Sequence, residues 1–269
     1  MLYCQTEEHC AARTEEEYTV KTALITGASS GIGREIAREL SRRGWRLLLV
    51  ARRRDRLEQL ARQLPTPCRL YVCDLSQERS CRWLYERTRE QNVTLLVNGA
   101  GFGLYGAFAQ TDLDRELEMI DVNIRAVHIL TKLFLRDFMR NNEGRILNIA
   151  SSAGFLPGPL LATYYATKNY VVRLSEAIYE ELRAAGSPVT ISCLCPGPVE
   201  TEFNQVAGAK SAARGVSCAQ VARQAVAQTL EGRLLIFPGR MVRLGAAAAR
   251  LVPEKQLLRL VRGFQEKKG

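Results

Sequence analysis

The chain has 269 residues and 46% hydrophobic residues, which suits one large globular domain with a sizeable core. No apolar run approaches the roughly 18 residues of a membrane-spanning helix, and the polar residues 1–17 lack the hydrophobic stretch of a signal peptide. The net charge of +10 can attract nucleic acid or anionic lipid, but no nucleic-acid-binding motif accompanies it, so solvated helix faces and phosphate contacts explain it better.

Cysteine and histidine usage bears on cellular location and on metal binding. The eight cysteines are scattered without any Cys-x-x-Cys pair, which predicts reduced thiols in a cytoplasmic protein. Cys193 and Cys195 share one side of a predicted strand, where we expect them only to pack. The chain has only His9 and His128, and His9 falls in a polar leader, so we expect no metal site.

Short apolar runs alternate with amphipathic stretches between residues 21 and 239, a pattern typical of βαβ units. The predicted strands are Thr22–Thr26, Arg46–Val50, Leu70–Cys73, Thr94–Asn98, Arg145–Ser151, Thr190–Cys195 and Leu234–Phe237. The predicted helices are Gly31–Arg43, Arg54–Leu64, a long one from Asp112 to Met139, Tyr164–Leu182, and one from an N-cap at Ser217 to Leu230. We therefore predict an α/β fold with a doubly wound parallel sheet of about seven strands and helices on both faces.

Two segments flank this domain. Residues 1–20 form a polar leader with a net charge of −4, and residues 240–269 form a basic extension with a net charge of +6. In the extension, Pro253 can begin a helix with an apolar face and basic residues elsewhere; the apolar face consists of Leu257, Leu260, Val261 and Phe264. We expect this amphipathic helix to pack on the domain near the mouth of the substrate site; contact with an anionic membrane surface is the alternative.

A glycine-rich turn follows the first predicted strand of the domain. Gly27, Gly31 and Gly33 have the spacing Gly-x3-Gly-x-Gly and open a helix. Glycine permits positive φ and close approach of backbone to a ligand, and the N-terminus of a helix presents unpaired N–H groups to a pyrophosphate. The turn therefore predicts a phosphate-binding loop, although taken alone it is also compatible with a simple tight turn.

The end of the second predicted strand indicates which dinucleotide binds. An acidic residue at this position binds an unphosphorylated ribose, but this strand ends Val50-Ala-Arg-Arg-Arg54. Arginine matches the geometry of a phosphate group, so Arg52 and Arg53 favour NADP(H). The alternative interpretation is a solvated run of charge at the start of a helix.

Three further residues carry acid–base chemistry. Tyr164 and Lys168 are four residues apart in a predicted helix and share one face. The lysine ammonium is expected to lower the pKa of the tyrosine, which then exchanges a proton with a carbonyl or alcohol oxygen. Ser151, with Ser152 as runner-up, ends a strand and is expected to hydrogen-bond the same oxygen. Tyr165 is one position off and is expected to pack.

Taken together, these motifs resemble those of the short-chain dehydrogenase/reductase superfamily over about residues 21–239. Within the superfamily, the sequence of the motifs is similar to that of bacterial ketoacyl-reductase-like oxidoreductases. The resemblance implies a Rossmann-type fold and a catalytic tetrad of Asn123, Ser151, Tyr164 and Lys168, in which Asn123 holds a proton-relay water through a distorted helix. It also implies a turn at Asp74-Leu75 that contacts adenine and a segment, Pro196–Thr201, that flanks the nicotinamide. The segment Asn98-Gly-Ala-Gly101 matches the family's Asn-Asn-Ala-Gly motif except at Gly99, where the family has asparagine.

The motifs and the resemblance together predict the residues that bind the cofactor. They are Gly27, Ser29, Ser30, Gly31, Ile32, Gly33, Arg52, Arg53, Asp74, Leu75, Asn98, Ala100, Gly101, Tyr164, Lys168, Pro196, Gly197, Val199 and Thr201.

The expected function is an NADP(H)-dependent carbonyl reductase or alcohol dehydrogenase that acts on a ketone or secondary alcohol. A lid is expected in residues 202–216 and after Phe102, where apolar residues favour a 3-oxoacyl, hydroxysteroid or bulky aliphatic substrate. The alternative is a catalytically silent nucleotide-binding sensor or interaction protein on the same fold. Relatives pair the helices that begin near Asp112 and Tyr164 across a two-fold axis, which implies a homodimer or homotetramer.

Overall fold

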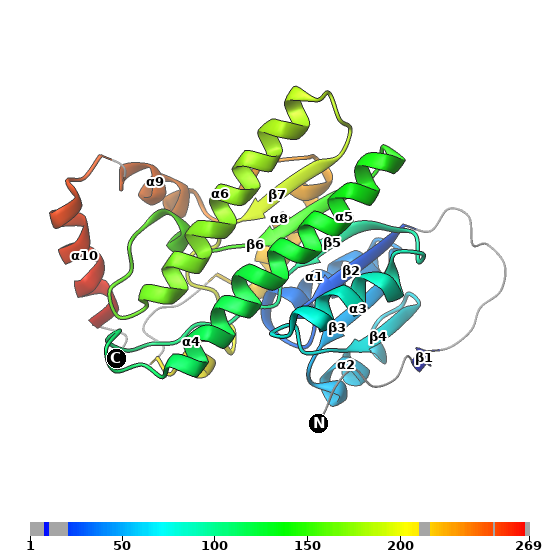
Figure 1. Ribbon diagram of the computed structural model, residues 1–269, viewed down its shortest axis with the longest axis horizontal. Helices are drawn as coiled ribbons and strands as arrows, with labels where there is room; N and C mark the ends of the chain where they lie inside the picture. The colour runs from blue at the N-terminus through cyan, green and yellow to red at the C-terminus, as the bar shows by residue number, and fades with distance from the viewer. Residues whose placement is uncertain (1–7, 11–20, 210–215, 250, 267–269) are drawn as a thin grey trace.

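The computed structural model describes residues 8–10, 21–209, 216–249 and 251–266. Most of the polar leader, part of the lid at residues 210–215 and the last three residues of the basic extension lie outside the described residues. Figure 1 shows a central sheet, with the long helices α5 (Val127–Asn141) and α6 (Ala162–Ala184) in front of it.

The sheet has eight strands in the order β1-β4-β3-β2-β5-β6-β7-β8. Their bounds are β1 Glu8–Cys10, β2 Thr22–Thr26, β3 Arg46–Ala51, β4 Cys68–Val72, β5 Val93–Asn98, β6 Arg145–Ile149, β7 Thr190–Leu194 and β8 Leu235–Ile236. The strands from β2 to β8 are all parallel, which confirms the predicted doubly wound sheet of seven strands. The additional strand β1 pairs antiparallel with β4 and was not predicted, because three residues of a polar leader carry no recognisable strand pattern.

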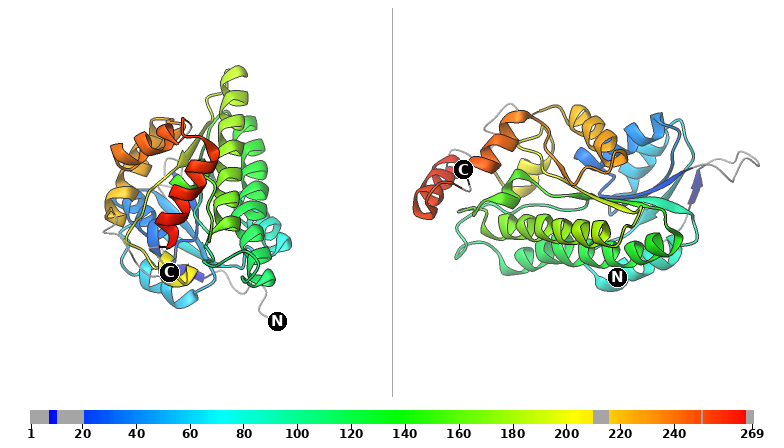
Figure 2. Two further views of the ribbon diagram at one scale, coloured as in Figure 1. Left: turned by 90° about the vertical axis from the view of Figure 1, so that its left-hand side faces the viewer. Right: turned by 90° about the horizontal axis from the view of Figure 1, so that it is seen from above.

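Helices cover both faces of the sheet (Figure 2). One face carries α1 (Gly31–Arg42), α2 (Arg54–Ala61) and α8 (Cys218–Leu230), and the other carries α3 (Glu78–Thr88), α5 and α6. Successive strand residues alternate between the two cores: Ile25 packs toward α1, while Leu24 packs toward α5. The continuous apolar runs of the strands follow from this double burial. Helix α3 was not predicted.

The long helix predicted from Asp112 to Met139 is divided into three parts. Helix α4 (Leu113–Ile120) leads into the π-helix η1 (Asp121–Ala126), which continues as α5. The Asp112 side chain caps α4 by accepting a hydrogen bond from the backbone N–H of Arg115 at 2.8 Å. A π-helical turn inserts one residue into the helical repeat, and a hydrophobic pattern does not reveal such an insertion.

The remaining elements lie near the site. They are the 3-10 helix η2 (Ser152–Phe155), α7 (Phe203–Ala207) in the predicted lid, α9 (Arg240–Ala248), and α10 (Glu254–Glu266), which begins directly after Pro253. Ser217 is the N-cap residue of α8, as predicted, but its side chain makes no capping hydrogen bond.

The backbone of the glycine-rich turn packs directly against the backbone at the end of β5, because no side chains separate the two segments. A Cβ atom on Gly33 would lie 2.5 Å from the carbonyl oxygen of Gly27, and one on Gly27 would lie 2.6 Å from the carbonyl carbon of Gly99. Gly27 also has a φ of +71°, which disfavours any side chain. Thr26 ties the two segments together, because its Oγ1 accepts hydrogen bonds from the N–H groups of Gly99 and Ala100 at 3.0 and 3.2 Å.

We expect Gly33→Ala to lower the free energy of unfolding by about 1–3 kcal/mol, because the new methyl group has only rigid backbone as its neighbour. Gly245→Ala in α9 is the matched control: its Cβ atom would meet nothing within 4 Å, so no loss is expected. Chemical denaturation of both variants measures the difference. Equal stability of the two variants would contradict the close packing described for this turn.

Candidate active site

The carboxyl ends of the parallel strands border a cavity of about 490 Å³. Its walls come from the residues that end or follow β2 to β7, together with the lid helix α7. This is the edge at which open parallel α/β sheets bind their ligands, and the volume falls in the range of about 300–1,000 Å³ typical of small-molecule sites.

Most of the predicted site residues line this one cavity. They are Gly27, Ser29, Ser30, Gly31, Ile32, Gly33, Arg52, Arg53, Asp74, Leu75, Ala100, Gly101, Ser151, Tyr164, Lys168, Pro196, Gly197, Val199 and Thr201. Asn98 and Asn123 do not line it. The structure therefore brings together segments that lie far apart in the sequence.

Arg53 lies against the glycine-rich turn. Its Nη2 donates hydrogen bonds to the Oγ atoms of Ser30 and Ser29 at 3.0 and 3.3 Å, and its Nη1 donates to Glu202 Oε2 at 3.3 Å. Arg56 donates a second hydrogen bond to the Glu202 carboxylate and, with Arg53, holds its pKa below the usual value. The lid and the glycine-rich turn are thus joined across the cavity by charge-assisted hydrogen bonds.

Arg52 takes a different direction from Arg53. It forms an ion pair with Glu118 of α4 at 2.8 Å, and more than half of its side chain is exposed. Asp74, opposite the arginines, forms a turn in which its Oδ1 accepts a hydrogen bond from the N–H of Ser76 at 3.1 Å. Both arginines line the cavity, so both remain able to meet a ligand there.

Ser151 and Tyr164 meet at the other end of the cavity. Ser151 follows β6 and caps η2, where its Oγ accepts a hydrogen bond from the N–H of Ala153 at 3.1 Å. The Ser151 side chain lies close enough to the Tyr164 hydroxyl to lower its pKa, and both residues line the cavity. Lys168, one turn further along α6, donates from Nζ to the carbonyl oxygen of Ile149 at 2.8 Å and lies 5.9 Å from the centre of the Tyr164 ring.

The pKa of Tyr164 differs from the expectation. Burial raises it to about 12, and the nearby Ser151 side chain offsets this only in part. Burial also lowers the pKa of Lys168 to about 8. Desolvation disfavours the charged form of each group and is the main cause of both pKa shifts. A phenol with such a pKa stays protonated at neutral pH, which equips Tyr164 to donate a proton.

Asn123 lies behind the cavity wall, within the π-helix η1. It is fully buried; its Oδ1 accepts from the N–H of Phe102 at 3.1 Å, and its Nδ2 donates to the carbonyl oxygen of Phe102 at 2.9 Å and to Thr167 Oγ1 at 3.1 Å. A Cβ atom on Gly101 would lie 2.8 Å from Asn123 Oδ1 and 3.5 Å from Lys168 Nζ. Asn123 therefore holds the cavity wall through the Phe102 backbone, and only Gly101 stands between it and Lys168.

Asn98 was predicted to bind cofactor, but its side chain turns away from the cavity. Its Nδ2 donates to Asn148 Oδ1 at 2.8 Å and to Thr131 Oγ1 at 3.0 Å, and Asn148 in turn donates to Ser175 at 3.0 Å. As the last residue of β5, Asn98 points to the face of the sheet that α5 and α6 cover. Its role is to pair buried polar groups in the core.

Some residues of the apolar half of the cavity were predicted and others were not. Phe102, Phe203 and Val206 line it, as expected for the lid and the segment after Phe102, whereas Leu161 was not predicted and Tyr165 was expected only to pack. Phe203 lies with its ring centre 5.0 Å from that of Tyr164. The Glu202 pairing was also missed, because Arg53 is 149 residues away and no local pattern relates the two.

Helix α10 packs on residues that line the same end of the cavity. Gln265 donates a hydrogen bond from Nε2 to the hydroxyl of Tyr165. The backbone carbonyl oxygen of Gln265 accepts a hydrogen bond from the Tyr105 hydroxyl at 3.2 Å. Val261 is buried in a cluster with Phe102 and Tyr164. The C-terminal helix thus touches the residues that surround the proposed proton donor.

Comparison with known proteins gives a consistent result. A dehydrogenase/reductase SDR family member 11 from Gallus gallus is 35% identical over 199 residues, covering 70% of this chain and 78% of that protein. A short-chain dehydrogenase from Sphingobium yanoikuyae in complex with NADPH matches with a TM-score of 0.78 at 28% identity, over 86% of this chain and 94% of the other.

A short-chain dehydrogenase/reductase from Burkholderia phymatum in complex with NAD matches with a TM-score of 0.79 at 26% identity, over 87% of this chain and 94% of the other. The family model described as short chain dehydrogenase matches residues 21–212. From the fold, the cavity and these matches, we conclude that the chain belongs to the short-chain dehydrogenase family of oxidoreductases, which use nicotinamide cofactors.

Proposed function

We propose that the protein is an NADP(H)-dependent carbonyl reductase, reversible as an alcohol dehydrogenase, with Tyr164 as its general acid. One observation carries the proposal: a single cavity is lined by a glycine-rich turn and, elsewhere on its wall, by the neighbouring side chains of Ser151 and Tyr164. A dinucleotide needs phosphate contacts and a reaction centre along one continuous groove.

The residues at the first end suit a phosphorylated dinucleotide. Gly31 has a φ of +54°, which disfavours side chains, and the lack of a side chain there lets a ligand approach the backbone closely. The N-terminus of α1 would receive the pyrophosphate, and Arg52 and Arg53 would receive the 2′-phosphate. The bound coenzyme supplies the hydride.

The residues at the second end manage the proton. A carbonyl oxygen that approaches the Ser151–Tyr164 pair meets both hydroxyl groups. Ser151 orients this oxygen, and Tyr164, which its raised pKa keeps protonated, donates its proton as negative charge develops on it. Lys168 places a cation 5.9 Å from the centre of the ring and stabilises the phenolate that remains.

The apolar half of the cavity supports a lipophilic ketone or alcohol as substrate. Phe102, Leu161, Phe203 and Val206 surround the end that contains Tyr164. Hydrocarbon or ring surface placed against them gains about 25 cal/mol per Å² removed from water. The proposed substrate class therefore comprises 3-oxoacyl, hydroxysteroid and bulky aliphatic compounds.

We expect Tyr164→Phe to lower kcat by about 10²–10⁴-fold with coenzyme binding retained, because the change removes only the proton that the reaction needs. Tyr165→Phe is the matched control, since this neighbour also lines the cavity and loses the same atom. NADPH oxidation with a panel of lipophilic ketones measures both. If Tyr164→Phe keeps more than about a tenth of the wild-type kcat, another group is the acid.

NADPH should be preferred over NADH, and Arg52→Ala should weaken NADPH binding by about tenfold to a hundredfold while leaving NADH binding nearly unchanged. The change removes one charge-assisted hydrogen bond to the 2′-phosphate. Arg62→Ala on the exposed end of α2 controls for net charge. Coenzyme fluorescence titration gives the dissociation constants. Equal losses for both coenzymes would show that the Arg52 guanidinium does not contact the 2′-phosphate.

The silent-sensor alternative has the same cavity but no turnover. It would bind coenzyme with the affinities just described and oxidise none of it with any ketone of the panel. Assays of binding and turnover on the same sample separate the two functions.

We also propose a homodimer or larger homo-oligomer. Helices α4 and α6 are in contact, and Leu113 and Leu117 on α4 are exposed, which suits burial against the same patch of a second chain. Light scattering at micromolar concentration should give at least twice the 30.1 kDa of one chain. A mass near that of one chain would contradict this assembly.

A further inference from the structure

Helices α9 and α10 form one end of the molecule, at the left of Figure 1. Five large apolar side chains on this helix pair and its connecting turn are between 56% and 87% exposed. We call these residues the terminal patch: Met241, Leu244, Leu251, Leu260 and Phe264. Large exposed apolar side chains that gather in one region of a surface mark interaction sites, and these five lie on the two helices and the turn that make up one end of the molecule.

The two sides of α10 have different surroundings. Val261 and Gln265 are buried against the domain, and Leu257 packs with them. Leu260 and Phe264, four residues apart, remain exposed to solvent. The packing of α10 on the domain therefore leaves part of its apolar surface exposed. Packing on the domain and contact with a membrane surface, the two alternatives considered for this helix, are thus compatible.

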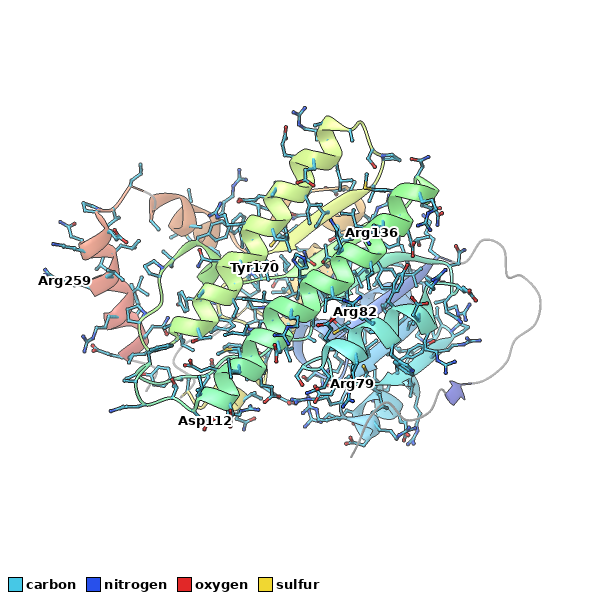
Figure 3. All side chains as sticks on the ribbon, in the orientation of Figure 1. Arg79, Arg82, Asp112, Arg136, Tyr170 and Arg259 are labelled. Carbon is cyan, nitrogen blue, oxygen red and sulfur yellow. The ribbon has the colours of Figure 1, made fainter. Side chains whose placement is uncertain are left out.

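The helices that carry the terminal patch also carry exposed positive charge. Arg243 on α9 and Lys255, Arg259 and Arg262 on α10 are exposed, and the sequence of residues 240–269 has a net charge of +6. Figure 3 shows Arg259 on α10, at the outer end of the molecule. A partner for this surface must be apolar in part and must carry negative charge.

We propose that the terminal patch binds the surface of an anionic lipid bilayer, with α9 and α10 lying in the interface between headgroups and acyl chains. Amphipathic helices with large apolar residues on one side and arginine or lysine beside them bind membranes in this way, and each basic residue near the surface adds to the attraction. Within the part of the chain that the structure describes, no helix has the length and apolar character needed to cross a bilayer, which leaves binding at the surface.

The position of the terminal patch gives this binding a consequence for the cavity. Gln265 of α10 hydrogen-bonds Tyr165, a cavity residue, and Val206 of the lid both lines the cavity and is about half exposed. A bilayer that covers the patch would therefore lie close to the apolar end of the cavity. A lipophilic compound dissolved in the membrane would reach it without crossing much water.

Co-sedimentation of the full chain with vesicles tests the proposal and does not depend on the proposed enzymatic function. Vesicles made of equal parts of phosphatidylglycerol and phosphatidylcholine should bind the protein, and vesicles of phosphatidylcholine alone should bind it at least about tenfold less tightly. Raising the salt from about 0.1 M to about 1 M should release it, because the screening length falls from about 10 Å to about 3 Å.

Two variants and a matched control locate the contact. Leu260→Ser with Phe264→Ser, and separately Arg259→Glu with Arg262→Glu, should each weaken binding to the anionic vesicles at least about tenfold. The control is Arg79→Glu with Arg82→Glu on α3, away from the terminal patch (Figure 3). It changes the net charge equally, and Arg82 pairs with Glu78 as Arg262 pairs with Glu266. Thermal melting confirms that each variant is folded.

Three results would overturn the proposal. The first is absence of binding to anionic vesicles by the full chain. The second is equal weakening by the control on α3, which would show attraction by net charge alone. The third combines two observations: the wild type does not bind vesicles, and its concentration-dependent mass in solution is lower in the Leu260→Ser, Phe264→Ser variant. Together these would assign the patch to contact with a second copy of the chain.

Discussion

The contact between the glycine-rich turn and the end of β5 is the constraint on which the rest of the site depends. Backbone atoms of Gly27, Gly33 and Gly99 come so close that a Cβ atom on Gly27 or Gly33 would overlap its neighbour. The Thr26 hydroxyl then fastens the same junction. This packing brings the N-terminus of α1 to the edge of the sheet, where its N–H groups face the cavity.

A second constraint operates at the opposite end of the cavity. The π-helical turn carries Asn123 into the interior, where its amide satisfies both backbone groups of Phe102 and the Thr167 hydroxyl. Phe102 and Lys168 line the cavity on the other side of this network. Buried polar networks of this kind are costly unless every group is paired, which is why a local distortion of the helix is tolerated here.

Much of the site was predictable because the strand ends coincide with the motifs. Continuous apolar runs marked the strands, and parallel connections require that all their carboxyl ends share one edge, so residues as distant as Gly27 and Pro196 could be assigned to one cavity. The direction in which an individual side chain points was harder to predict from the sequence. Asn98 turns into the core because of its register in β5, which no motif specifies.

Pairings between residues far apart in the chain, and the protonation state of Tyr164, could also not be predicted from the sequence. The contact between Arg53 and Glu202 depends on where the lid crosses the cavity, and the contact between Gln265 and Tyr165 depends on how α10 returns to the domain. The raised pKa of Tyr164 follows from its burial, which is known only once the surrounding chain is in place. Sequence spacing identifies the partners of such a group but not how dry its surroundings are.

The central claim is that hydride passes from a nicotinamide in this cavity to a carbonyl carbon beside Tyr164. The most direct measurement is to supply NADPH that carries deuterium at the transferable position together with a lipophilic ketone, and to follow the label by mass spectrometry or NMR. The result we expect is one deuterium on the carbinol carbon of the alcohol for each NADPH oxidised. Oxidation of NADPH without label on that carbon, or no oxidation with any ketone, would contradict the claim.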